Sequence, residues 1–227
     1  MNHRPGTGDE EGLMQLPRGV LAGLCSHLLS DALVAVRELN GQVLDALTSS
    51  AQTTRAFPLG PKLRARFAAL STHQRQRASQ CGVLLADAGF ANSERWRSLA
   101  LPGEHEDRTV QTDWLPVDDA VVLASTVLLV AWHIIRVRPS IAGFLLGMPE
   151  STVNAYRQLG VSELTRVARR HPQWVRPRWP DRLDLWHSIL EVDGDSPSHD
   201  TTSLVLRCLT ASAGMSSRLL LSVESTV

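Results

Sequence analysis

The sequence predicts an all-α fold: a multi-helix globular protein with a helix-turn-helix-like corner in its C-terminal half. Three observations support this prediction. Apolar residues recur at the three- and four-residue spacing of a helix face over long stretches. Proline, glycine and serine stand where such stretches begin or end. Of the 227 residues, 43% are hydrophobic and 20% are charged, a composition that supplies enough apolar side chains for a buried core.

The N-terminal half begins with a polar, glycine-rich segment, 1–12, which we expect to be a flexible tail. A long helix is expected at 16–47, because Pro17 suits a first turn and apolar residues recur along it. Ser71 and Asn92 are N-cap residues of two later helices. The shorter expected elements are a loop at 49–61, helices at 64–70 and 71–80, a strand or buried turn at 81–90, and a helix through 96–99.

The segment 101–117 is rich in acidic residues, and we interpret it as a linker between an N-terminal helical subdomain, 13–100, and a C-terminal one, 118–227. The most apolar helix is expected at 118–137, and Pro139 must end or kink it. The other expected elements are short helices at 139–146, 150–159 and 162–171, an extended segment at 175–179, a helix at 180–190, a loop at 193–199 and a last helix at 203–221. No internal repeat is evident.

The helix-turn-helix-like segment is expected at 139–171. Gly143 supplies the small residue that allows two helices to approach, and Gly147 and Gly160 stand at helix ends where a left-handed backbone is expected. The residues expected to face inward are Met148, Val153 and Tyr156. The residues expected to face outward are Ser151, Thr152, Asn154, Ala155, Arg157 and Gln158. Serine, asparagine, glutamine and arginine side chains can contact base edges or phosphate, so this corner is a candidate DNA-binding surface.

The charge distribution adds an independent observation. The net charge of the chain is zero, but the segment 157–182 has seven arginines against two acidic residues, a local balance of +5. Trp174 and Trp179 lie among these arginines, as in many phosphate-contacting surfaces. The predicted DNA-binding residues are Ser151, Thr152, Asn154, Arg157, Gln158, Arg166, Arg169, Arg170, Arg176 and Arg178.

Other interpretations remain open at this point. Small-residue corners also pack helices in proteins that bind no nucleic acid. Glu150 stands at the start of the candidate reading helix, where it would face phosphate. The basic stretch can also pair with the acidic residues that follow it towards the C-terminus. The alternative function is therefore a protein–protein assembly or adaptor module without DNA contact.

Residues 128–170 contain a long helix, a turn with Phe-Leu-Leu-Gly and two further helical segments. The matching positions are Ala142, Phe144, Leu146, Gly147, Leu159, Leu164, Val167 and Ala168. This pattern resembles the FlhD subunit of the bacterial flagellar master transcriptional activator. The resemblance implies a helical, oligomeric subunit that activates transcription with a partner, and the partner would share or dominate DNA contact. The chain departs from that family by about a hundred residues before the matching part and a helix after it.

Catalytic and metal-binding patterns are missing from the sequence. No two of the eight histidines are four residues apart, and neither H-E-x-x-H nor G-x-S-x-G occurs. The cysteines, Cys25, Cys81 and Cys208, are widely separated and form no metal-binding motif. We therefore predict a non-enzymatic protein with no catalytic residues, no metal and no cofactor.

The expected location is the cytoplasm, with no membrane partner. The most apolar run, 120–135, has 16 residues, fewer than the roughly 20 of a spanning helix, and fits a buried core helix. The leading hypothesis is thus a transcription-regulator-like helical protein that contacts DNA through the corner and the adjacent arginines. It would act as an oligomer or with a protein partner.

Overall fold

The computed structural model describes residues 18–53, 57–99 and 112–191, with side chains from residue 30 onward. It confirms the all-α prediction, since the described chain is helical apart from its connections and one pair of two-residue strands. The first elements are α1 (Arg18–Thr53), α2 (Pro61–Ala68), α3 (Thr72–Ser79), β1 (Ala86–Asp87) and α4 (Ser93–Leu99). The later ones are α5 (Val117–Val137), α6 (Pro139–Leu146), α7 (Glu150–Tyr156), α8 (Val161–Arg170), the 3-10 helix η1 (Pro172–Trp174), β2 (Arg176–Pro177) and α9 (Leu183–Leu190).

Several predicted helix ends are confirmed by local hydrogen bonds. The Ser71 hydroxyl accepts a hydrogen bond from the Gln74 backbone N–H at 3.2 Å, and the Gln74 side chain accepts one from the Ser71 N–H at 2.9 Å. These reciprocal bonds form a capping box at the start of α3. The Asn92 side chain accepts a hydrogen bond from the Arg95 N–H at 3.0 Å and so caps α4. Pro139 separates α5 from α6 as expected.

Several expected boundaries are wrong: for example, the helix expected at 150–159 ends at Tyr156, and the one expected at 180–190 begins at Leu183. Helix α1 continues to Thr53, so residues 49–53 of the predicted loop are helical. Gly160 has φ −92° and ψ 166°, an extended conformation, and it precedes α8 instead of ending α7 in the left-handed region. The predictions for 1–12, 101–111, 193–199 and 203–221 lie outside the described residues.

The described helices form two structural repeats, which the sequence did not reveal. Helices α7 and α8 begin 89 residues after α2 and α3, and β2 and α9 begin 90 residues after β1 and α4. The long helices α1 and α5 end 84 residues apart and bury equivalent positions, such as Leu39 and Leu123 or Leu44 and Leu128. The correspondence lies in the order and spacing of the elements, whereas no repeat is evident in the sequence. We call α1–α4 with β1 the first repeat, and α5–α9 with β2 the second.

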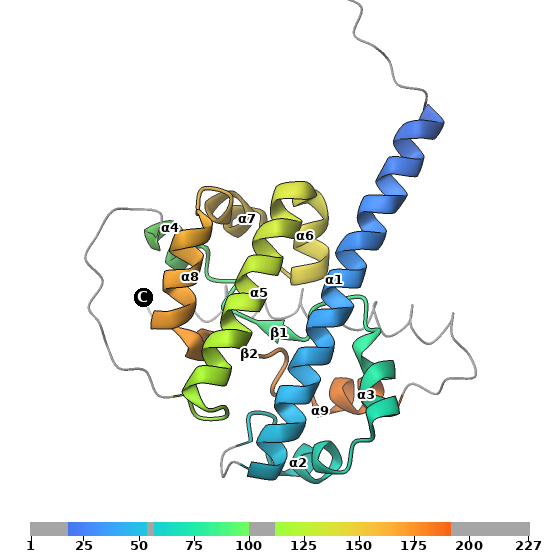
Figure 1. The fold of residues 1–227 in the computed structure, drawn as a ribbon, viewed down its shortest axis with the longest axis vertical. Coiled ribbons are helices and arrows are strands. Elements are labelled where there is room, and N and C mark those ends of the chain that lie inside the picture. The colour runs from blue at the N-terminus through green and yellow to red at the C-terminus, as the bar shows by residue number, and fades with distance from the viewer. Residues whose placement is uncertain (1–17, 54–56, 100–111, 192–227) are drawn as a thin grey trace, which may run out of the picture.

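The two repeats run in opposite directions where they meet. Strands β1 and β2 pair antiparallel, with Ala86 opposite Pro177 and Asp87 opposite Arg176. At the spacing of 90 residues, Ala86 is equivalent to Arg176 and Asp87 to Pro177, so each residue pairs with the equivalent of the other strand residue in its own repeat. Helices α1 and α5 pack side by side in opposite directions (Figure 1). Helices α2, α3 and α9 lie together at one end of the view, and α4, α7 and α8 lie at the other.

The repeats exchange their last helices. Trp96 of α4 packs on Tyr156 of α7, with ring centroids 4.8 Å apart, and Trp186 of α9 packs on Phe67 of α2 at 5.8 Å. Tyr156 and Phe67 occupy equivalent positions, as do the two tryptophans. The buried apolar residues before and after the predicted linker consequently form one continuous core.

Helix α5 is the one described helix that is long and apolar enough to cross a membrane, with a mean hydropathy of 2.0 in its most apolar window. Eight of its residues are buried in the core. A buried core helix meets the same criteria, so α5 is weak evidence for a membrane span.

Candidate nucleic-acid interface

The predicted corner is formed by α6, a short turn and α7. Gly147 adopts the left-handed region, with φ 67° and ψ 33°, and ends α6 as expected. A Cβ atom at Gly143 would lie 3.2 Å from the Met148 carbonyl oxygen, which is tighter than most such contacts. The two glycines therefore have the roles that the pattern predicts: one turns the chain and the other allows close approach.

The inward face of α7 is confirmed in part. Met148, Val153 and Tyr156 are buried as predicted. Thr152 and Ala155 are also buried, so their predicted outward orientation is wrong. The Thr152 hydroxyl donates a hydrogen bond of 2.8 Å to the Phe90 carbonyl, which comes from the first repeat. Thr152 is thus a packing residue.

Two long-range hydrogen bonds hold the end of α7 against α5. The Tyr156 hydroxyl donates to the Leu128 carbonyl at 2.9 Å, and the Trp132 indole N–H donates to the Leu159 carbonyl at 2.9 Å. Burial raises the pKa of Tyr156 well above its ordinary value, because the ionised form would lose its hydration. These contacts fix the direction of α7, and with it the direction of its exposed face.

Four of the predicted residues are exposed here: Ser151 and Asn154 on α7, and Arg157 and Gln158 directly after its end. On α8, Arg166 and Arg169 are exposed and, at a spacing of three residues, share one face of the helix. Arg157, Arg166 and Arg169 form no ion pair with another described residue. Arg170 is half-buried and has interactions of its own.

Arg178 does not belong to this surface, so its predicted exposure is wrong. Its side chain is buried, with the guanidinium group 4.7 Å from the centre of the Trp179 ring. Its Nη1 donates a hydrogen bond of 3.3 Å to the Leu84 carbonyl. A Cβ atom at Gly147 would lie 1.4 Å from Arg178 Nη2, so the guanidinium group covers the turn directly. Arg178 thus ties the corner to the region around the two strands.

Arg176 is exposed and belongs to β2, not to α7 or α8. Its guanidinium group is 3.8 Å from the Asp113 carboxylate, and its Nε donates to the Gln173 carbonyl at 3.1 Å. Arg176 and Asp113 line a small cavity of about 240 Å³ with Trp114 and Pro177. An acidic neighbour reduces the positive potential that Arg176 can offer to phosphate.

The two tryptophans of the arginine stretch are structural. Trp179 is buried, and Trp174 lies half-buried, 4.3 Å from a stacked His171 ring and 4.5 Å from the Arg95 guanidinium group. The sequence pattern missed Arg95 because this residue belongs to α4, far away in the chain. Helix α4 packs against α7 and also brings the exposed Arg97 to this end of the molecule.

Among the described residues, no three His, Cys, Asp or Glu side chains are grouped to hold a metal ion. The surface of α7 and α8 offers hydrogen-bond donors, amide groups and three cationic side chains.

No protein-family model, no curated protein and no solved structure matches the chain.

Proposed function

We propose that this protein contacts DNA through the exposed face of α7 and α8 and acts as a regulator of transcription. The observation that carries the proposal is the contrast between the two repeats. Asn154, Arg157 and Gln158 occupy positions that are exposed alanines in the first repeat, namely Ala65, Ala68 and Ala69. Alanine at these positions is compatible with the fold, so the polar groups of the second repeat serve something other than packing.

The chemistry of these groups suits duplex DNA. Asparagine and glutamine amides can pair with adenine in the major groove, and arginine can pair with guanine or hold a phosphate. Arg166 and Arg169, on the next helix, are suited to phosphate contacts that position the protein without reading sequence. Because the whole chain is neutral, attraction depends on this local patch and should weaken steeply with salt.

The test measures fluorescence anisotropy of labelled duplexes, drawn from a library of genomic fragments, over a salt series. We expect Arg166→Ala with Arg169→Ala to weaken binding to all duplexes and to reduce the salt slope by about 2, since each phosphate contact contributes about 0.9. Asn154→Ala with Gln158→Ala should instead change preference among duplexes by about 1–3 kcal/mol at the affected base pairs.

The first repeat supplies the matched controls. Lys62→Ala removes a charge from α2, the equivalent of α7, and Arg77→Ala removes one from the position equivalent to Arg166. Both controls should leave DNA binding unchanged. Failure of the wild-type protein to bind any duplex at low salt, alone or with proteins that co-purify with it, would contradict the proposal.

A protein partner is the second candidate function, and the exposed apolar residues favour it. Val122, Phe144 and Val161 of the second repeat are 65%, 45% and 46% exposed, and among the described residues of the first repeat Val34 is 47% exposed. The FlhD-like pattern of 128–170 is consistent with a partner subunit or a homo-oligomer. If the protein is only an assembly module, Phe144→Ser should disrupt a complex measured by light scattering, while the arginine variants should have no effect on any DNA measurement.

With either function, we propose that the protein is cytoplasmic and non-enzymatic and needs no cofactor.

A further inference from the structure

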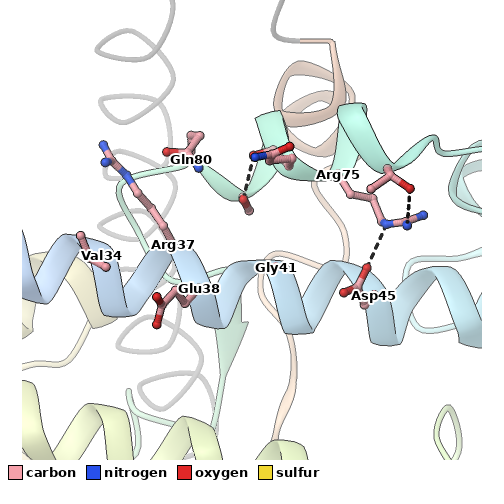
Figure 2. A pocket seen from close by; sticks show the side chains of 10 residues that line it. Val34, Arg37, Glu38, Gly41, Asp45, Arg75 and Gln80 are labelled. Carbon is pink, nitrogen blue, oxygen red and sulfur yellow. Dashed lines mark hydrogen bonds and ion pairs between the residues drawn. The ribbon is translucent and has the colours of Figure 1, made fainter.

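An open groove of about 520 Å³ lies between α1 and α3 (Figure 2). Its wall on α1 is formed by Val34, Arg37, Glu38, Gly41 and Asp45, and its wall on α3 by Thr72, Arg75, Gln76, Ser79 and Gln80. Arg37 and Asp45 are eight residues apart on one helix, so the groove is about 12 Å long. This size suits a small organic molecule.

The equivalent positions of the second repeat carry different side chains. At the equivalent positions of α5 and α8, Arg37, Glu38 and Asp45 are replaced by Val121, Val122 and Leu129. Arg75, Gln76 and Ser79 are replaced by Leu164, Thr165 and Ala168, and Leu164 is fully buried. The same pair of helices thus carries mostly apolar residues at these positions in one repeat, and charged and amide groups in the other.

Gly41 lies between the two ends of the groove. Glycine in the middle of a helix costs roughly 1 kcal/mol relative to alanine. Apart from its chain neighbours and the backbone of its own helix, no described atom lies within 4 Å of the position that a Cβ would take at Gly41, so packing among the described residues does not demand glycine here. The missing side chain keeps space open in the groove, and the equivalent residue of the second repeat is Ser125.

The two ends of the groove differ in charge. At one end, the Arg75 guanidinium group is 2.9 Å from the Asp45 carboxylate and also donates to Thr72, so its charge is balanced (Figure 2). At the other end, Arg37 lies beside Gln80 and forms no ion pair with a described residue. Its Nε is buried without a hydrogen-bond partner. A partly desolvated cation that forms no ion pair with the described residues is costly, and an anion would relieve that cost.

We propose that the groove binds a small organic anion, with its carboxylate or phosphate at Arg37 and its body extending past Gly41 towards the Arg75–Asp45 pair. The amides of Gln76 and Gln80 are suited to donate further hydrogen bonds to the ligand. This proposal is independent of the DNA contact, because it concerns the other repeat and none of its residues lies on α7 or α8.

The experiment uses the full chain and isothermal titration calorimetry at low salt, with succinate, inorganic phosphate and adenosine monophosphate as probes. Binding of succinate but not phosphate would indicate a carboxylate site. Tighter binding of the nucleotide than of inorganic phosphate would indicate that the groove also contacts the body of a phosphate ester. We expect at least one of these anions to bind the wild-type protein. Arg37→Ala should weaken that binding at least tenfold, because it removes a charge-assisted hydrogen bond.

Gly41→Leu should abolish binding by filling the groove, whereas Ser125→Leu, the same enlargement at the equivalent position of α5, should leave it unchanged. Circular dichroism and thermal unfolding of each variant show whether the fold is retained. Arg37→Gln, which preserves most of the side-chain volume, provides a second measurement if Arg37→Ala unfolds. No binding of any probe to the wild type overturns the proposal, as does binding that survives both Arg37→Gln and Gly41→Leu.

Discussion

Tyr156 is the only tyrosine of the chain, and its hydroxyl is buried against the Leu128 carbonyl. Burial holds its pKa well above the ordinary value of about 10. We therefore expect the folded protein to show no tyrosinate absorbance in the near-ultraviolet near pH 10. The unfolded chain should titrate at that pH. A midpoint near pH 10 in protein that is still folded would contradict the buried hydroxyl.

The same shift has a consequence for stability. Because the pKa of Tyr156 is raised in the folded state, its contribution is complete below about pH 10 and is lost as the pH rises further. Tyr156→Phe should remove this alkaline loss, and should cost about 1 kcal/mol at neutral pH for the missing hydrogen bond. Phe67 at the equivalent position of the first repeat indicates that the ring alone fits.

Single residues of the candidate site were predictable where their environment is local. Helical spacing correctly placed Met148, Val153 and Tyr156 in the core, because neighbouring residues of one short helix determine that face. Thr152 and Arg178 were predicted to be exposed but are buried. Their partners, the carbonyl groups of Phe90 and Leu84, lie 62 and 94 residues away, and no local pattern reveals such contacts.

At the scale of elements, the exchanged helices α4 and α9 are anchored by equivalent tryptophans. The Trp96 indole N–H donates to the Gly89 carbonyl at 3.1 Å, and the Trp186 indole N–H donates to the Trp179 carbonyl at 3.2 Å. Gly89 and Trp179 both have positive φ, 71° and 52°. In each repeat, an indole N–H therefore bonds to the carbonyl of a positive-φ residue seven positions earlier in the chain.

We expect Trp96→Phe and Trp186→Phe to destabilise the protein by similar amounts, about 1–3 kcal/mol each. Each variant loses volume in the core and leaves carbonyl groups without their indole donor. Urea unfolding followed by circular dichroism measures both values, and Val122→Ala on the exposed side of α5 serves as a near-neutral control. If one tryptophan proved dispensable, the equivalence of the two anchors would be wrong.

Helix positions could largely be predicted from the sequence, and their pairing could not. Caps such as Ser71 and Asn92, and the break at Pro139, depend on a few adjacent residues. The repeat escaped detection because the spacing between equivalent elements changes from 84 to 89 and then to 90 residues, and α6 has no counterpart among the described residues of the first repeat. Equivalent residues also differ in chemistry, as Asp45 and Leu129 do.

At the scale of the whole molecule, the number of arginines in the segment 157–182 overstates how many of them form an exposed basic surface. Of the seven arginines at 157–182, Arg178 is buried, Arg182 pairs with Asp184 at 3.0 Å, and Arg176 lies 3.8 Å from Asp113. The three that are exposed without an ion pair among the described residues are Arg157, Arg166 and Arg169. A count of charges along the chain cannot include such pairings, since each depends on the folded structure.

The exchange of α4 and α9 makes both repeats depend on one core, so we expect them to unfold together. Leu63 of α2 is fully buried in the first repeat, and Leu63→Ala should lower the free energy of unfolding by about 2–5 kcal/mol. Native-state hydrogen exchange should then show the same loss of protection in amides of α8, in the second repeat. A shared core transmits the destabilisation of one repeat to the other. Loss of protection confined to α1–α3 would therefore show that the repeats unfold separately.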